Sequence, residues 1–139
     1  MKIILAADGS KFTKKALAFL VNHESLAEAD EIVVLNVQQA LPPRVVRLAG
    51  SAVVRDYHQD EAEMVLAPIR KFLDRKDLPH RCEWKVGDPA QQVLATAQKE
   101  KAHLIMMGTH GHGLVGRAIM GSVAQRVLQG AEIPVLLVR

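Results

Sequence analysis

The chain has 139 residues, of which 49% are hydrophobic and 24% charged, a length and balance typical of one globular domain. We therefore expect a single domain over residues 1–139. The formal charge is +3, but both signs are interspersed, and the aromatic residues are one tryptophan, one tyrosine and three phenylalanines. Without a run of basic residues or a row of aromatic ones, the chain is not expected to bind nucleic acid.

The cysteine content and the N-terminus indicate the compartment. Cys82 is the one cysteine, so no internal disulfide can form, as suits a reducing cytoplasm. The apolar run at the N-terminus is broken by Asp8 and is too short for a secretory signal or a membrane span. We expect a complete cytoplasmic protein that does not insert into a membrane.

The first elements in the chain are two buried strands separated by a helix. Residues 2–7 and 31–37 are continuous apolar runs, typical of strands that are covered on both faces of a sheet. Between them, residues 11–23 place Phe12, Ala16 and Leu20 on one helical stripe. The pattern therefore predicts a strand, a helix and a second strand.

The next part of the chain is less regular. Residues 38–54 contain Pro42-Pro43 and Gly50-Ser51, which predict an irregular excursion loop. Apolar residues then recur at helical spacing over residues 55–76, where Pro68 is expected to kink or restart the helix.

The third strand is predicted from strict alternation. Residues 81–86 place Cys82, Trp84 and Val86 on one face and charged residues on the other, which indicates a half-exposed strand near a sheet edge. Asp88, Pro89 and Gln91 then have the pattern of an N-cap, a first helical residue and a capping-box partner, and they predict a helix to about Lys101. The histidines outside the glycine-rich stretch are expected at the surface or at helix ends; they are His23, His58, His80 and His103.

The last elements predict the fold class. Apolar strands at 103–108 and 134–138 flank a helix over 123–129, capped by Ser122 with Gln125. Five strands that alternate with helices favour a three-layer α/β sandwich, with a parallel sheet covered by helices on both faces. The most distinctive residues follow the first and fourth strands, so we place these strands side by side at the switch point, in the order 3-2-1-4-5.

A glycine-rich stretch, GTHGHGLVGRAIMGS, follows the fourth strand at residues 108–122. Gly111, Gly113 and Gly116 match G-x-G-x-x-G, but a dinucleotide fold needs an acidic residue at the end of a second strand, and Glu132 precedes the last strand instead. A phosphate loop of the Walker type is excluded because no Lys-Ser or Lys-Thr follows the glycines. The glycines instead precede a helix that begins near Gly121 and Ser122, and such a helix start is suited to binding phosphate.

The spacing Gly108-x2-Gly111-x9-Gly121-Ser122 resembles the ATP-binding signature of the universal stress protein family, G-x2-G-x9-G-(S/T). The resemblance covers essentially the whole chain, including LAADGS, VGDPAQQVLATAQKEKAHLIMMGTHG and GSVAQRVLQGAEIPVLLVR. It implies a Rossmann-like fold of the adenine nucleotide alpha hydrolase type. It places the chain with the family's nucleotide-binding branch rather than with the branch that lacks the glycines.

The resemblance also implies a role for individual residues. Asp8, at the end of the first strand, would lie near the adenine or ribose, Val37 would offer its backbone to the adenine, and Met107 with Gly108 would flank the ribose. The residues around the phosphates would be His110, Gly111, Gly121, Ser122 and Val123. The complete implied set is Ala6, Ala7, Asp8, Val37, Met107, Gly108, His110, Gly111, Gly121, Ser122 and Val123.

Several residues in and around this set have a simpler interpretation. Asp8 could only cap the first helix, Ser122 could only cap the last one, and Arg117 could contact phosphate or be solvated. His110 and His112, two residues apart and without a nearby cysteine or carboxylate, make a poor zinc site. We expect no intrinsic metal site, and favour a divalent cation, Mg²⁺ or Mn²⁺, that arrives with ATP.

Three functions remain open. The first is a cytoplasmic regulatory protein of the stress response, in which ATP, ADP or AMP biases contacts with partners. The second is a slow ATPase, with Asp8 and His110 as the only candidates for a base. The third is a ligand-independent accessory subunit of a transporter or signalling protein. The resemblance also implies a homodimer joined through the C-terminal strand, residues 134–139, an apolar sheet edge in need of a cover.

Overall fold

The computed structural model describes residues 1–112 and 120–139. Its five strands form one parallel sheet in the order β3-β2-β1-β4-β5, as the sequence predicts. The strands are β1 (Lys2–Ala6), β2 (Glu31–Gln38), β3 (His80–Val86), β4 (Leu104–Gly108) and β5 (Val135–Val138). The helices are α1 (Lys11–Asn22), α2 (Glu24–Ala27), α3 (Pro43–Ala49), α4 (Ser51–Arg75), α5 (Pro89–Lys99) and α6 (Ser122–Gly130).

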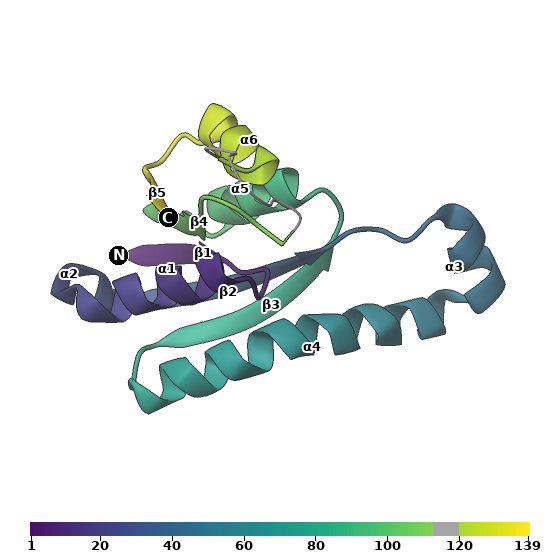
Figure 1. Ribbon diagram of the computed structural model, residues 1–139, viewed down its shortest axis with the longest axis horizontal. Helices are drawn as coiled ribbons and strands as arrows, with labels where there is room; N and C mark the ends of the chain where they lie inside the picture. Colours follow the sequence, from purple (N-terminus) through teal and green to yellow (C-terminus); the bar gives the residue numbers. More distant parts are fainter. Residues whose placement is uncertain (113–119) are drawn as a thin grey trace.

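Helices cover both faces of the sheet and produce three layers (Figure 1). Because successive strand residues point to opposite faces, Ile3 and Leu5 of β1 pack with α1 and α4, whereas Ile4 packs with α5 and α6. The middles of the central strands β1, β2 and β4 are therefore mainly apolar, and Ile3, Ile4 and Leu5 have no exposed surface. The half-exposed strand β3 lies at one edge, as its alternation predicts, and β5 lies at the other.

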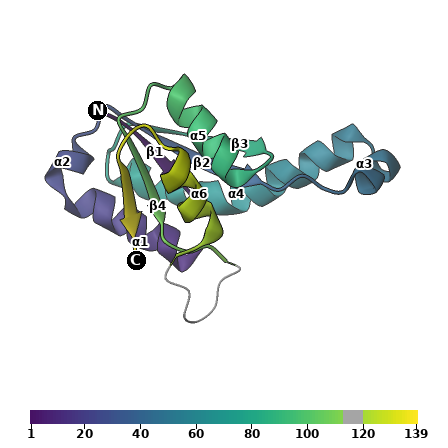
Figure 2. The same cartoon turned by 90° about the horizontal axis from the view of Figure 1, so that it is seen from above.

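The excursion loop predicted for residues 38–54 is wrong, because most of this segment is helical. Helix α3 occupies Pro43–Ala49, and α4 begins at Ser51. Helix α4 has 25 residues, so its length is roughly 37 Å, whereas the eight residues of β2 span only about 26 Å. The start of α4 and all of α3 therefore extend beyond the sheet, as both views show (Figures 1 and 2).

Other local predictions also need correction. Helix α4 continues through Pro68 without a restart, because the buried residues on either side of it, Leu66 and Ile69, hold both turns against the sheet. The N-cap of α6 is Gly121, and Ser122 is already the first helical residue. His58, expected at the surface or at a helix end, lies inside α4 and is only 3% exposed. The Asp88 cap is confirmed, since its carboxylate accepts a hydrogen bond from the Gln91 N–H (2.9 Å).

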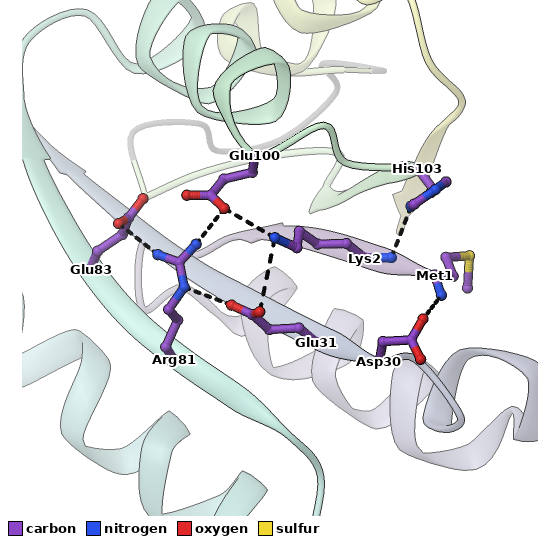
Figure 3. Close-up of polar contacts among 8 residues, drawn as sticks. All are labelled: Met1, Lys2, Asp30, Glu31, Arg81, Glu83, Glu100 and His103. Carbon is purple, nitrogen blue, oxygen red and sulfur yellow. Dashed lines mark hydrogen bonds and ion pairs between the residues drawn. The ribbon is translucent and has the colours of Figure 1, made fainter.

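A cluster of charges joins the amino-terminal ends of three strands to the end of α5 (Figure 3). The Arg81 guanidinium contacts the carboxylates of Glu31 (2.6 Å), Glu83 (3.1 Å) and Glu100 (2.5 Å). The Lys2 ammonium lies 3.2 Å from the same Glu100 carboxylate. We call these five residues the Arg81 cluster. Hydrogen bonds from Arg81, and then from Lys2, lower the pKa of Glu100 below its ordinary value.

The Arg81 cluster makes the stability depend on pH in one direction. Because the pKa of Glu100 is lower in the folded chain than in the unfolded chain, its stabilisation is complete above the unfolded value, about 4.3, and is lost as the pH falls through the folded value. We therefore expect Glu100→Gln to lower the urea midpoint at pH 7 and to have a smaller deficit relative to the wild type when the pH is lowered to 3. The exposed Glu132 lies outside the cluster, so Glu132→Gln should leave the midpoint unchanged; an equal deficit of Glu100→Gln at both pH values would contradict this.

Candidate functional site

The sheet register brings the sequence-predicted residues to one edge. Ala6 of β1 pairs with Leu35 of β2, and Leu5 pairs with Met106 of β4. The carboxyl ends of β1 and β4 are thus nearly level, β2 continues three residues further to Gln38, and Ala7 and Met107 are buried at 5% and 6% exposure. The chain leaves β1 toward α1 on one face and leaves β4 toward α6 on the other, so the two ends form a topological switch point.

Asp8 is fixed by the first turn of α1. Its Oδ1 accepts hydrogen bonds from the Ser10 N–H (2.9 Å) and from the Thr13 hydroxyl (3.0 Å), and its own N–H donates to Thr13 Oγ1 (3.1 Å). The N-cap residue of α1 is Ser10 rather than Asp8. Ser10 Oγ is buried here without a hydrogen-bond partner in the described part of the chain, which is unusual for a buried hydroxyl.

The two ends of the glycine-rich stretch meet beside β4. The Gly121 N–H donates to the Thr109 carbonyl (2.6 Å), and the Thr109 N–H donates to the Val138 carbonyl of β5 (2.9 Å). This pair of hydrogen bonds places Gly121, and with it the first turn of α6, next to the end of β4. Gly113, Gly116 and Arg117 lie outside the described residues.

The two histidines of the stretch contact the elements around Asp8. His110 Nδ1 lies 2.8 Å from Thr109 Oγ1, and its ring is 4.9 Å from that of Phe12 in α1. His112 Nε2 lies 2.6 Å from the backbone oxygen of Asp8. Within residues 1–112 and 120–139, no three histidine, cysteine or acidic side chains are grouped so that they could hold a metal ion.

Two glycines of the motif are needed for close packing. A Cβ on Gly108 would lie 2.4 Å from the Cβ of Phe12 and 3.3 Å from its backbone, so only glycine allows α1 to pack against β4 here. A Cβ on Gly111 would lie 2.8 Å from Asp8 Oδ2. Close packing against Phe12 therefore explains the glycine at position 108 without a ligand. The glycine at position 111 leaves the space beside the Asp8 carboxylate unfilled.

The first turn of α6 points its backbone amides toward this edge. Ser122 is exposed, Val123 is half-buried, and among residues 1–112 and 120–139 no side chain caps the helix. The helix is held in place by Arg126, whose guanidinium makes two hydrogen bonds to the carboxylate of Asp88 (2.8 and 2.6 Å). The bond from Arg126, and then that from the Gln91 N–H, lower the pKa of Asp88. A helix start of this kind is a site for anions.

Some residues that build the site have no distinctive sequence pattern. Asn36 is 3% exposed inside β2, and its amide donates to the Ala7 carbonyl (2.8 Å), while Gln38 donates to Asn36 Oδ1 (2.6 Å). This chain of hydrogen bonds holds the end of β1 against β2. In the sequence, Asn36 is visible only as one polar residue within an apolar run. This pattern does not identify its partner, Ala7, 29 positions away.

The chain belongs to the universal stress protein family, whose family model matches residues 1–139. A universal stress protein of Thermus aquaticus is 34% identical over 138 residues, which are 99% of this chain and 97% of that protein. One from Methanocaldococcus jannaschii is 30% identical over 139 residues, 99% of this chain and 81% of the relative. No helix in the described residues is long and apolar enough to cross a membrane.

Solved structures share the fold at lower identity. A universal stress protein from Lactobacillus plantarum superimposes with a TM-score of 0.81 at 19% identity, over 100% of this chain and 97% of that one. A family protein from Arabidopsis thaliana with AMP bound superimposes with a TM-score of 0.70 at 17% identity, over 99% of this chain and 90% of that one. A universal stress protein in complex with cAMP superimposes with a TM-score of 0.62 at 18% identity, over 100% of this chain and 96% of that one.

The packing of Gly108 can be tested by adding one methyl group. Gly108→Ala forces the new Cβ against the Cβ and backbone of Phe12, and should lower the free energy of unfolding by about 1–3 kcal/mol in urea. Gly130→Ala is the matched control, because its Cβ would meet only the flexible end of Leu94, 2.6 Å away. It should change stability by less than about 1 kcal/mol. Equal losses in the two variants would contradict the steric account.

Proposed function

We propose that this chain is a cytoplasmic, single-domain regulatory protein of the stress response that binds ATP, or another adenine nucleotide, at the carboxyl ends of β1 and β4. The observation that carries the proposal is the hydrogen bond from the Gly121 N–H to the Thr109 carbonyl (2.6 Å). It brings the first turn of α6 to the switch point of the sheet, where α/β proteins of this kind bind ligands.

The residues at this edge suit the parts of a nucleotide. The exposed Ser122 hydroxyl and the backbone amides of Ser122 and Val123 would bind phosphate oxygens. The Asp8 carboxylate suits a ribose hydroxyl or an amine, since it would repel phosphate. The buried Ala7 and Met107 provide an apolar floor, and the backbone at the end of β2 near Val37 would contact the adenine.

The family protein with AMP bound and the universal stress protein in complex with cAMP, both of the same fold, support the proposal of an adenosine site. The preference for ATP rests on the Gly108, Gly111, Gly121 and Ser122 motif. The remaining residues of the implied set, Ala6 and His110, lie at the same edge. A divalent cation, Mg²⁺ or Mn²⁺, would arrive with the nucleotide and neutralise its phosphates.

We propose binding without efficient hydrolysis. Asp8 Oδ1 already accepts two hydrogen bonds, so that oxygen is engaged in holding the start of α1. His110 Nδ1 is within hydrogen-bond distance of Thr109 Oγ1. Both candidate bases thus have structural contacts, and we expect bound ATP to act as an effector that favours one set of partner contacts over another.

Calorimetric titration with ATP and with adenosine tests the site. Ser122→Ala removes one hydroxyl hydrogen bond to a charged phosphate. It should weaken the affinity for ATP by about tenfold or more and leave the affinity for adenosine unchanged. Gly111→Val should weaken both, because its side chain would occupy the space beside Asp8. Ser25→Ala, at an exposed serine of α2, is the control. No heat and no thermal shift at millimolar ATP would instead favour the ligand-independent accessory role.

We also propose a homodimer joined through β5. In the ladder to β4, Ile105 N donates to the Pro134 carbonyl and Thr109 N to the Val138 carbonyl, so alternate residues of β5 face β4. The backbone groups of Val135 and Leu137 accordingly face the open edge of the sheet. An apolar open edge is a surface that needs a partner.

Leu137→Pro tests this dimer, because proline removes the outward N–H donor while the inward ladder to β4 is kept. Sedimentation at micromolar concentration should give a dimer for the wild type and a monomer for the variant, with circular dichroism showing that both are folded. A wild-type monomer, or a folded variant that still dimerises, would refute the β5 interface.

A further inference from the structure

A cavity of about 330 Å³ lies where α3 and the start of α4 cover the ends of β2 and β3. Its walls are mainly apolar and come from Leu41, Val46, Val54 and Trp84. The volume lies within the range of small-molecule sites, roughly 300–1,000 Å³. None of the residues proposed to bind a nucleotide lines this cavity.

His58 is a buried polar side chain in the wall of the cavity. It is 3% exposed, and its Nδ1 has no hydrogen-bond partner within residues 1–112 and 120–139. Its ring lies 6.5 Å from that of Trp84 and 5.4 Å from that of Tyr57. A buried polar group without a partner is costly, and a ligand in the cavity would satisfy His58 Nδ1 once the imidazole turns toward the cavity, because Nδ1 itself has almost no exposed surface.

Arg55 supplies a positive charge at the same place. Its guanidinium lies 6.0 Å from the centre of the Trp84 ring, and it lines the cavity. Arg70, Arg81 and Arg126 each contact a carboxylate, whereas none of the described residues offers a carboxylate to Arg55. An apolar cavity with one uncompensated cation at its edge is complementary to an apolar ligand with one negative charge.

We propose that this cavity binds a small amphipathic organic anion, an aromatic or alicyclic ring that carries a carboxylate. The ring packs against Trp84 and the aliphatic walls. The carboxylate accepts hydrogen bonds from the Arg55 guanidinium and from an imidazole N–H of His58. This site is separate from the nucleotide site and does not depend on it.

The emission of Trp84 reports directly on this cavity, because it is the single tryptophan of the chain. We would titrate the full-length protein with hydrocinnamate, a phenyl ring on a short carboxylate chain, and with the matching alcohol and amine. The expected result is a saturable change in emission with the order of affinity anion, alcohol, amine. Saturating ATP should leave the affinity for hydrocinnamate unchanged.

Variants at the exposed Arg55 separate charge from apolar burial. Arg55→Gln should weaken the affinity for hydrocinnamate by about tenfold, as expected for the loss of one charged hydrogen bond, and leave the affinity for the alcohol unchanged. Arg55→Glu should make the amine the preferred compound. Arg44→Gln is the matched control, because Arg44 is an exposed arginine of α3 that does not line the cavity.

His58→Leu provides a second readout. It should weaken hydrocinnamate while keeping or raising the melting temperature, because it removes a buried group that has no partner. A lower melting temperature for His58→Leu would contradict the view that His58 is unsatisfied.

Three outcomes of the titration would overturn the proposal. The first is no saturable change with hydrocinnamate. The second is equal affinity for all three compounds with no effect of Arg55→Gln, which would mean a non-selective apolar cavity. The third is displacement by ATP, or an emission change that follows protein concentration alone, which would assign the signal to the nucleotide site or to a second copy of the chain.

Discussion

The burial of the three central strands on both faces is the constraint on which the other features of this fold depend. Ile3, Ile4 and Leu5 are fully buried, so β1 needs helices above and below it and hydrogen-bonded strands on either side. The connections after β1 and β4 consequently run to opposite faces, and an edge remains between them. The position of the switch point thus follows from the strand order, and the glycines, Asp8 and α6 lie around it.

The strands and their order could be predicted from the sequence, because each apolar run has the length and composition of a buried strand and the connections permit few arrangements. Helix α3 and the start of α4 could not. Pro42-Pro43 and Gly50-Ser51 have the composition of a loop, yet here Pro43 begins one helix and Gly50 precedes the next. Moreover the seven residues of α3 are too few to show a clear helical period, and none of them is buried.

The same limit applies to the candidate site. The spacing of Gly108, Gly111, Gly121 and Ser122 is visible in the chain, and the register places these residues at one edge. The contacts that fix the edge join residues far apart, such as His112 with the Asp8 backbone across 104 positions, and no local pattern encodes them. The burial of His58 is not predictable from the sequence, because it depends on how far α4 continues over β3 in the folded chain.

The overhang of α3 and the start of α4 has a consequence for how the molecule fluctuates. Leu48, Val53 and Tyr57 are exposed at 79%, 59% and 46%, so this end of the helix pair has little contact with the core. The free energy needed to open it is set by its own hydrogen bonds rather than by global unfolding. Amide exchange there is therefore governed by local opening, and any ligand held beneath it adds its binding free energy to the cost of that opening as well as to that of global unfolding.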